Sequence, residues 1–304
     1  MTVAVLLSSY NGAPYLEEQL ASLSAQTHRD FVVVIRDDGS TDETAKIIRN
    51  YGTADPRFRY KFGANIGAVA SYFQLIEEVG GEFEYCAFCD QDDVWNEDKL
   101  ERAVARLSQA PDVPSMYFSA LDVVDDKLQH LFLTSPPRRA LRLSNAAVEN
   151  IATGCSVVIN RRLLALLQAS PPRTSHVFMH DWWIYLIASA VGVVIYDPNP
   201  GLLYRQHRGN VVGLKSGIYK IFRGVKNLRS PQRGPRISTQ LNEFARLFGD
   251  RVSPDDWAVI KDLRENAADA RLARRLRSLI GRKYYRQSVV NEFGLAFSIL
   301  LNRI

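Results

Sequence analysis

The first hundred residues alternate between strand-like and helix-like apolar patterns, and this alternation limits the fold more than any other feature of the sequence. Short apolar runs typical of buried strands are separated by longer runs with apolar residues at helical spacing. The strand-like runs are 3–7, 31–35, 58–62 and 85–89, and the helix-like runs between them are 15–23, 44–48 and 69–79. Repeated strand–helix units form parallel sheets, because each crossover returns the chain to the same edge. We therefore predict an α/β fold with a Rossmann-like, mostly parallel sheet flanked by helices.

A cluster of polar residues follows each predicted strand at the point where the strand ends. The clusters are Ser-Ser-Tyr-Asn at 8–11, Asp-Asp-Gly-Ser at 37–40, Gly-Ala-Asn at 63–65 and Asp-Gln-Asp-Asp at 90–93. One such cluster alone is typical of a turn, since Asn-Gly and Asp-Gly pairs form turns readily. Four of them share one edge of a parallel sheet, however, and open α/β sheets bind ligands at that edge. The carboxyl ends of the strands are therefore the predicted site.

The acidic character of this edge indicates the type of ligand. The chain contains neither G-x-x-x-x-G-K-[ST] nor G-x-G-x-x-G, so it lacks the common glycine-rich phosphate-binding loops. Carboxylates repel a phosphorylated ligand, so such a ligand can bind at this acidic edge only if a cation lies between its phosphates and the carboxylates. Asp90 and Asp92, with Asp93 beside them, offer the carboxylate oxygens that Mg²⁺ and Mn²⁺ prefer, and we predict a metal–diphosphate site. The alternative for an isolated D-x-D is a solvated turn that caps a helix over 97–107.

Cysteine content and apolar stretches bear on the cellular compartment. Three cysteines are too few for a disulfide framework and favour a reducing compartment. No charged leader precedes an apolar run at the start, so we expect no signal peptide and a cytoplasmic protein. The longest apolar stretch, 182–196, is shorter than the roughly 20 residues of a membrane-spanning helix and predicts a buried helix followed by a strand. Cys86 and Cys89 form a C-x-x-C inside a predicted strand, where a redox or zinc role is a minor alternative.

Charge is distributed unevenly and predicts a boundary near residue 214. Residues 215–304 contain 19 Lys and Arg against 8 Asp and Glu, whereas residues 1–214 contain 19 against 25. A segment with Ser-Pro and Gly-Pro pairs at 230–235 has the composition of a linker. Helical apolar spacing follows it at 240–248, 254–263 and 267–280. We predict one domain over 1–214 and a basic helical region over 215–304.

The polar clusters in this order resemble the motifs of glycosyltransferase family 2, which has the GT-A fold. Further motifs resemble the bacterial rhamnosyltransferase-like branch of that family: Thr-Gly-Cys at 153–155, His-Asp-Trp-Trp at 180–183, Tyr-Arg-Gln-His at 204–207 and Asn-Val-Val-Gly at 210–213. The resemblance covers about residues 1–214 and not the basic region. It implies a nucleotide-sugar-binding half over 1–100 and an acceptor half over 101–214.

The resemblance also implies roles for individual residues. Ser8, Tyr10, Asp38, Asn65 and Gln91 correspond to nucleotide-binding positions, although Asn65 equally suits a turn. Asp90 and Asp92 correspond to the ligands of a divalent cation, Mn²⁺ or Mg²⁺. His207 matches a position that reaches the metal or the diphosphate in the family, with a surface histidine as the alternative. The region around the donor and acceptor sugars corresponds to Asp93, Gly154, Cys155, Trp182, Trp183 and Arg205, with one of the two tryptophans expected in the core.

Asp181 is the expected general base. In the family a carboxylate at the start of a helix in the acceptor half removes the proton of the attacking hydroxyl, and Asp181 stands before the apolar run 182–190. Attack on the face opposite the leaving diphosphate makes the reaction inverting. The alternative for Asp181 is an N-cap, because aspartate is a preferred residue before an apolar helix.

The expected activity is transfer of a sugar from a nucleotide diphosphate to a saccharide or lipid-linked saccharide in cell-surface polysaccharide synthesis. The branch resemblance favours dTDP-L-rhamnose as the donor, with a UDP-hexose as the alternative. A two-metal nucleotidyltransferase would need a basic triphosphate site, which residues 1–100 lack. A nucleic-acid-binding protein is suggested only by the basic region, and clustered Lys and Arg alone are weak grounds for it.

The basic region closes with an apolar segment over 293–301. Together with the positive charge, this segment predicts a reversible contact with anionic lipid at the inner face of the membrane, or with a lipid-diphosphate acceptor. The alternative is a helical cap whose apolar end packs on the catalytic domain.

Overall fold

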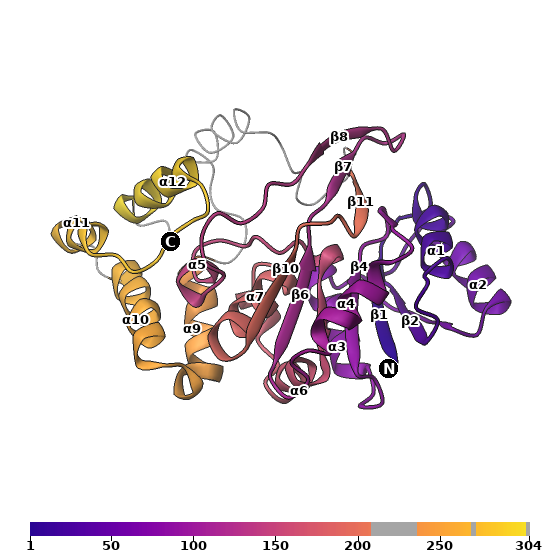
Figure 1. The fold of residues 1–304 in the computed structure, drawn as a ribbon, viewed down its shortest axis with the longest axis horizontal. Coiled ribbons are helices and arrows are strands. Elements are labelled where there is room, and N and C mark those ends of the chain that lie inside the picture. Colours follow the sequence, from indigo (N-terminus) through magenta and orange to yellow (C-terminus); the bar gives the residue numbers. More distant parts are fainter. Residues whose placement is uncertain (208–235, 269–271, 302–304) are drawn as a thin grey trace. The chain divides into compact units, whose positions relative to one another are not determined.

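The computed structural model of the 304-residue chain describes residues 1–207, 236–268 and 272–301 (Figure 1). Two compact units are formed from interleaved parts of the sequence. The first contains residues 1–136, 152–171 and 192–212, and the second contains residues 137–151, 172–191 and 213–304. The units are defined by contacts between residues, whereas the boundary predicted near residue 214 was based on charge. Residues 137–151 and 172–191, which precede that boundary, therefore belong to the same unit as the C-terminal part. The catalytic and basic regions expected from the sequence stay predictions.

A seven-stranded sheet with the order β10-β6-β9-β4-β1-β2-β3 forms the centre of the first unit. The strands are β1 Val3–Ser9, β2 Phe31–Asp37, β3 Phe58–Phe62, β4 Tyr85–Cys89, β6 Ser115–Ser119, β9 Val158–Asn160 and β10 Val193–Asp197. Strand β1 pairs in parallel with both β2 and β4, and β9 is antiparallel to β4 and β6. The helices that flank the sheet in this unit are α1 Leu16–Ser24, α2 Thr44–Ala54, α3 Ala68–Glu78, α4 Lys99–Leu107 and α6 Arg161–Ala169.

Burial explains why the sequence predicted these strands well. All five residues of β4 are buried, including Cys86 and Cys89, as expected for a central strand that is covered on both faces. The predicted strands at 58–62 and 85–89 match β3 and β4, and β1 and β2 each extend two residues beyond their predictions. The extension matters for function, because the polar clusters at 8–11 and 37–40 begin inside the strands.

A second, four-stranded sheet with the order β5-β11-β7-β8 lies in the same unit. Its strands are β5 Val94–Trp95, β7 Asp122–Val124, β8 His130–Leu133 and β11 Leu202–Arg205. Strand β5 directly follows the D-x-D segment, and its Trp95 and Val94 pair antiparallel with Leu202 and Leu203 of β11. The segment after β11 therefore passes close to residues 92 and 93.

The second unit is helical in the part that the structure describes. Its α-helices are α5 Leu143–Ala146, α7 His180–Val191, α9 Ile237–Phe248, α10 Pro254–Ala268, α11 Leu272–Ile280 and α12 Val289–Leu300. The ring of Trp183 on α7 meets the rings of Phe244 and Phe248 on α9 at centroid distances of 6.3 and 6.4 Å, and the two phenylalanines stack. The stretch 182–196 forms a buried helix followed by β10, as predicted.

The sequence Ser-Thr-Asp-Glu at 40–43 has the pattern of a capping box and predicts a helix start there. The capping box expected at 40–43 does not form, because Ser40 Oγ donates to Asp37 Oδ1 and accepts from the backbone N–H of Asn11, while α2 begins at Thr44 with no side-chain cap on Glu43. The linker at 230–235 and the motif at 210–213 lie outside the described residues. Among the helices that are described, none combines the length and the apolar character that crossing a membrane requires.

Candidate active site at the carboxyl end of β4

Asp90 is the first residue after β4, and a buried tyrosine orients it. The hydroxyl of Tyr72 on α3 lies 2.8 Å from Asp90 Oδ1 and 2.7 Å from the carbonyl oxygen of Cys89. Burial, together with the charge of Asp90, raises the pKa of Tyr72 well above its ordinary value. The phenol therefore stays protonated and donates to both oxygens. This contact fixes one carboxylate of the D-x-D at the sheet edge.

Asp92 is paired with His207, which follows β11. Nε2 of His207 lies 2.8 Å from Asp92 Oδ2, and the imidazole packs at a tilt of 31° against the ring of Tyr15 with a centroid distance of 4.5 Å. The pairing of β5 with β11 brings these two residues together. Asp92 and His207 together offer a carboxylate oxygen and an imidazole nitrogen, donors that suit Mn²⁺, whereas the ligand atoms of Asp90 lie within 4.8 Å of those of Asp93 and Cys155. The residues present thus fit the divalent cation that the sequence analysis expects.

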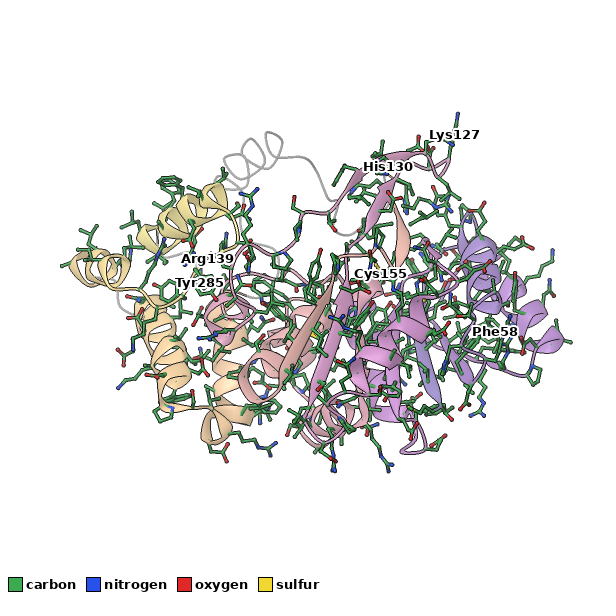
Figure 2. All side chains as sticks on the ribbon, in the orientation of Figure 1. Phe58, Lys127, His130, Arg139, Cys155 and Tyr285 are labelled. Atoms are coloured by element: carbon green, nitrogen blue, oxygen red, sulfur yellow. The ribbon has the colours of Figure 1, made fainter. Side chains whose placement is uncertain are left out.

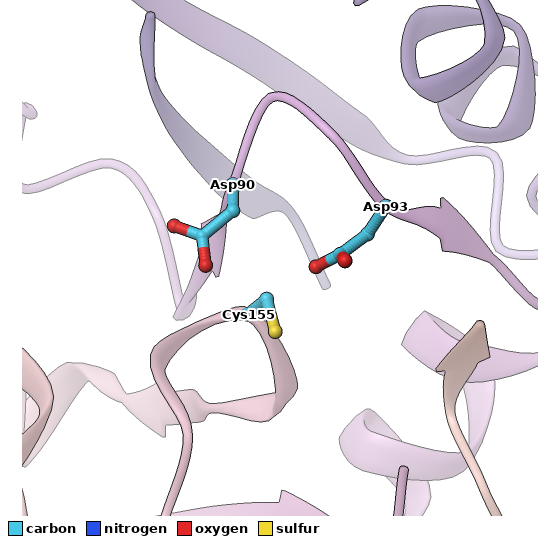
Figure 3. Close-up of side chains that lie close together, drawn as sticks. All are labelled: Asp90, Asp93 and Cys155. Atoms are coloured by element: carbon cyan, nitrogen blue, oxygen red, sulfur yellow. The ribbon is translucent and has the colours of Figure 1, made fainter. Parts of the chain in front are cut away.

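Asp93 and Cys155 lie beneath this edge and are fully buried. Figure 3 shows Asp90 and Asp93 on one loop, facing Cys155 on another, and their potential ligand atoms all lie within 4.8 Å of one another. Burial and the charges of Asp92 and Asp90 raise the pKa of Asp93 well above its usual range. Burial and the charge of Asp93 likewise raise that of Cys155. The raised pKa values favour the protonated forms of both groups, and their buried ligand atoms lie in one cluster with those of Asp90.

Lys99, the first residue of α4, is a buried cation that the sequence analysis did not identify. Its ammonium donates to the carbonyl oxygen of Cys155, and Nζ lies 3.0 Å from the ring centroid of Trp95. Burial lowers the pKa of Lys99 from 10.5 to about 7. A lysine in the first turn of an amphipathic helix reads as solvent-exposed in a sequence, and only the tertiary structure shows that it faces inward. Lys99 connects the turn η1 (Gly154–Ser156) with the segment after the D-x-D.

Arg205 connects the loop after β4 to two other segments. Its guanidinium donates to the carbonyl oxygens of Asp92 and Asp126, each at 2.9 Å, and forms an ion pair with Glu18. Its backbone N–H donates to Asp93 Oδ1 at 3.1 Å. The side chain is buried. These contacts place Arg205 behind the D-x-D loop as a positioning group, in the region where the resemblance expects a sugar-site residue.

Gln91 joins the D-x-D loop to the end of β1. Its Oε1 accepts from Ser9 Oγ at 2.7 Å and from the backbone N–H of Tyr10 at 2.9 Å, while its Nε2 donates to the carbonyl oxygen of Tyr10 at 3.1 Å. A Cβ atom on Gly12 would lie 2.2 Å from Gln91 Oε1, so this approach requires glycine at position 12. Gln91 thus sets the spacing between two predicted parts of the site.

Asp38 and Arg36 organise the loop at 64–67. One oxygen of Asp38 accepts from the backbone N–H of Ile66 at 2.8 Å and the other from that of Gly67 at 2.9 Å. Arg36 forms a buried ion pair with Asp38, and it donates to the carbonyl oxygen of Ala64 at 2.9 Å. The sequence analysis missed Arg36, because nothing in a strand-end Arg-Asp-Asp distinguishes a buried guanidinium from an exposed one.

The other nucleotide-binding candidates lie on the same side of the sheet edge. Ser8 Oγ donates to Ser71 Oγ at 2.6 Å and is partly exposed. Tyr10 and Asn65 are exposed and available to a ligand. The structure therefore brings the polar clusters after β1, β2, β3 and β4 to one edge, as predicted.

The second unit contains Asp181, Trp182 and Trp183. Helix α7 begins at His180, so Asp181 lies inside the first turn rather than at the N-cap position, and its Oδ1 accepts from the backbone N–H of Trp182 at 2.6 Å. Trp182 Nε1 donates to the carbonyl oxygen of Ala146 at 2.7 Å. Trp183 is the tryptophan of the pair that belongs to the core.

Comparison with known proteins decides the family. The family described as "Glycosyl transferase family 2" matches residues 4–167, which is more than half of the chain. The chain belongs to glycosyltransferase family 2. It is therefore an enzyme of glycosyl transfer, and the resemblance seen in the sequence is confirmed.

Two relatives carry informative names. The dTDP-rhamnosyl transferase RfbG of Shigella flexneri is 30% identical over 225 residues, covering 68% of this chain and 73% of that protein. The putative teichuronic acid biosynthesis glycosyltransferase TuaG of Bacillus subtilis is 30% identical over 174 residues, covering 57% of this chain and 67% of that protein.

Among solved structures, S. aureus TarS 1–349 in complex with UDP-GlcNAc matches with a TM-score of 0.58 and 18% identity, covering 100% of this chain and 90% of that chain. The fold class is GT-A, as predicted.

Proposed function

We propose that this glycosyltransferase moves L-rhamnose from dTDP-L-rhamnose to a saccharide or lipid-linked saccharide acceptor, with inversion of the anomeric centre. The observation that carries the proposal is the pairing of Asp92 with His207 next to Asp90 at the carboxyl end of β4. This arrangement suits a cation-bound diphosphate. The choice of rhamnose is supported by the name of the relative RfbG, and a UDP-hexose is the alternative donor.

Asp90, Asp92 and His207 would hold the divalent cation, Mn²⁺ or Mg²⁺. When bound, such a cation stabilises the negative charge that develops on a departing diphosphate. Tyr72 and Arg205 position the two aspartates from behind, through the Asp90 carboxylate and the Asp92 carbonyl. Contacts of this kind keep ligands in the orientation that metal binding requires.

Asp181 would act as the general base that accepts the proton of the acceptor hydroxyl. It is buried in the first turn of α7, where the helix N-terminus interacts favourably with a carboxylate. An ionised carboxylate is the form that can accept a proton.

Nucleotide recognition would come from Tyr10, Asn65 and the loop that Asp38 and Arg36 organise. The exposed ring of Tyr10 can stack on a nucleobase. The loop at 64–67 can offer backbone groups to the base edge. In the structure both carboxylate oxygens of Asp38 accept hydrogen bonds from this loop. Asp38 would therefore aid nucleotide binding by holding the loop in place, and its remaining lone pairs could accept from the base.

The direct test is incubation of the protein with dTDP-L-rhamnose, UDP-glucose and UDP-GlcNAc in turn, with Mn²⁺ present and with EDTA. Free nucleoside diphosphate is measured in the presence of lipid-linked saccharide extracts. We expect release from dTDP-L-rhamnose with Mn²⁺ and none with EDTA. Faster release of nucleoside diphosphate from a UDP-sugar would show that the donor is a UDP-hexose rather than dTDP-L-rhamnose. Full activity in EDTA would show that the reaction does not need a divalent cation. A thermal-shift screen of the same nucleotides gives an independent readout, because a ligand of the native state raises the melting temperature.

A further inference from the structure

Helix α12 carries apolar side chains on two opposite faces. Leu295 and Ile299 are buried on the inner face, and Arg275 of α11 donates to the carbonyl oxygen of Leu300 at 2.9 Å. The apolar residues that are exposed on α12 and immediately after it are Val289 (69%), Val290 (52%), Phe293 (73%), Phe297 (46%) and Leu301 (45%). At 3.6 residues per turn these five fall within an arc of roughly 120°. We call them the outer stripe of α12.

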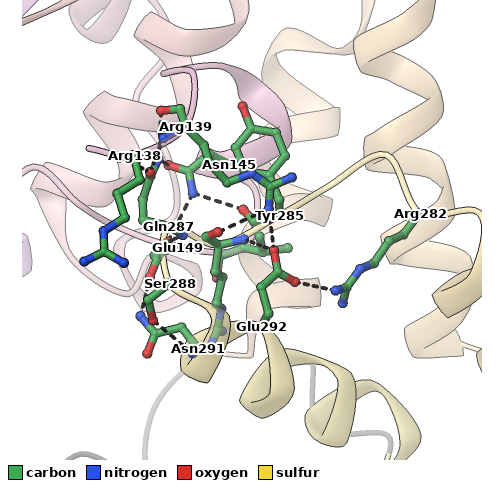
Figure 4. A network of polar contacts seen from close by, with 12 residues as sticks. Arg138, Arg139, Asn145, Glu149, Arg282, Tyr285, Gln287, Ser288, Asn291 and Glu292 are labelled. Carbon is green, nitrogen blue, oxygen red and sulfur yellow. Dashed lines mark hydrogen bonds and ion pairs between the residues drawn. The ribbon is translucent and has the colours of Figure 1, made fainter. Parts of the chain in front are cut away.

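The outer stripe is not the result of a loosely attached helix end. Ser288 caps α12 by accepting from the backbone N–H of Asn291 at 3.1 Å. Asn291 Nδ2 donates to Glu149 Oε1 at 2.7 Å, and the backbone N–H of Gln287 donates to Glu149 Oε2 at 2.6 Å (Figure 4). Glu149 belongs to the segment after α5, in the same unit. The start of α12 is therefore fixed in an orientation that points the outer stripe away from these contacts.

The charge around α12 is strongly positive. Residues 271–304 contain eight Arg and Lys and a single acidic residue, Glu292. That carboxylate accepts from Arg139 at 2.7 Å and forms a second ion pair with Arg282 (Figure 4). The side chain of Lys283 is 65% exposed and lies 3.9 Å from the carboxylate of the exposed Asp255. The one negative charge on the described part of α12, that of Glu292, is therefore paired with two arginines.

We propose that the outer stripe of α12 docks this protein on an anionic lipid bilayer, with α12 lying in the plane of the interface. The apolar side chains would enter the boundary between headgroups and acyl chains, and the basic residues around them would contact lipid phosphates. Exposed apolar side chains gathered on one helix face mark an interaction surface, whereas single ones do not. A second copy of the chain is the less suitable occupant, because self-association would bring two strongly basic segments together.

Vesicle flotation of the full chain tests the proposal. The protein is mixed with vesicles of phosphatidylcholine alone, or of phosphatidylcholine with phosphatidylglycerol, at low and at high salt and without any donor sugar. We expect flotation only with the anionic vesicles and mainly at low salt, because screening weakens attraction to the surface. The double variant F293S/F297S removes two large apolar side chains that are 73% and 46% exposed, and we expect its partition to fall by about tenfold or more.

A matched control separates this effect from a general loss of apolar surface. Leu131 and Leu133 of β8 are 50% and 55% exposed and lie in the first unit, so L131S/L133S should float as the wild type does. Absence of flotation would overturn the proposal, and so would equal flotation on neutral vesicles. A wild-type dimer in light scattering that F293S/F297S dissociates would instead assign the stripe to a second copy. None of these readouts uses the glycosyl-transfer reaction, so failure here leaves the proposed function untouched.

Discussion

His207 Nε2 lies 2.8 Å from Asp92 Oδ2, although 115 residues separate the two along the chain. The imidazole nitrogen of His207 and the carboxylate oxygen of Asp92 are both atoms that can coordinate a divalent cation. A cation bound between these two atoms would replace the contact between them, so the pair is the point where the cation proposal is most open to test.

We expect H207A to weaken Mn²⁺ binding by at least the roughly 10–100-fold found when an outer-shell partner of a metal site is removed, because His207 is itself a proposed ligand. D92A should abolish Mn²⁺-dependent nucleotide binding. Titration of Mn²⁺ by calorimetry, with and without nucleoside diphosphate, measures both effects. The chain offers a matched control in His130 (Figure 2), whose Nδ1 lies 2.5 Å from Asp122 Oδ1 in the hairpin of β7 and β8. H130A should bind Mn²⁺ as the wild type does. Equal losses in H130A and H207A would show that the effect is not specific to the D-x-D.

D181N is expected to keep the fold and donor affinity while kcat falls by roughly 10²–10⁴-fold, the usual contribution of a general base. Asparagine preserves the size of the side chain and its acceptor for the backbone N–H of Trp182. Steady-state kinetics with a defined acceptor and a nucleotide-binding titration give the two quantities. D250N, at an exposed aspartate of the same unit, serves as the control. Near-normal turnover in D181N would leave Asp181 with a structural role alone, and a product that keeps the donor's anomeric configuration would rule out the inverting mechanism.

Replacement of Arg36 should reveal how the loop at 64–67 depends on a buried charge. R36M leaves the carboxylate of Asp38 buried without its cation, a change that typically destabilises a protein by about 3–5 kcal/mol. We expect a lower free energy of unfolding in urea and weaker binding of nucleoside diphosphate. R59M, at an exposed arginine of the neighbouring strand β3, should change neither quantity. Unaltered stability in R36M would mean that Asp38 is satisfied by the backbone N–H groups alone.

The acid stability of the second unit should depend on Glu243. This side chain is 2% exposed. Its burial raises the pKa, but hydrogen bonds from Arg246 and from the backbone N–H of Arg173 outweigh that effect and lower the pKa from 4.5 to about 2. The unfolded chain thus binds the proton more readily than the folded one, so Glu243 contributes its full stability above pH 4.5 and loses it as the pH falls toward 2.

The substitution E243Q should remove this pH dependence. Thermal melts between pH 7 and pH 3 are expected to show a smaller decrease for E243Q than for the wild type. At pH 7 the variant should be less stable by about 1.5–3 kcal/mol, the usual worth of hydrogen bonds to a charged group. Parallel melting curves for the two proteins across this range would contradict the assignment.

The sheet and the position of the site were predictable from the sequence for a simple physical reason. Strand β4 is buried on both faces and is therefore continuously apolar, and the polar residues that follow it mark its end without ambiguity. The capping box at 40–43 failed because two partners outside the local sequence, Asp37 and Asn11, compete for Ser40. A local pattern cannot show such competition.

The resemblance named Arg205, but the burial of Arg205, Lys99 and Arg36 behind the candidate site could not be predicted from the sequence. Lys99, Arg36 and Arg205 are charged residues in positions that read as exposed, and their burial depends on contacts with distant segments. Arg205, for example, contacts residues 18, 92 and 126. Hydrophobic periodicity reports which apolar residues turn inward, but it says nothing about a charge that is buried together with its partners.

The pairing of β5 with β11 has a consequence for the order in which the enzyme becomes competent during synthesis. Strands β1 to β4 can pair once residue 89 has left the ribosome, since domains begin to fold from the N-terminal side as they emerge. Residues 202–207 follow more than a hundred residues later, and contacts across such separations form late because closing the intervening loop costs entropy. The polar clusters after β1 to β4 are therefore synthesised, and can come together, before His207 is available. If His207 is a ligand, the chain should bind the cation tightly only after residues 202–207 have been synthesised and β11 has paired with β5. Cation binding would then report that the first unit has finished folding.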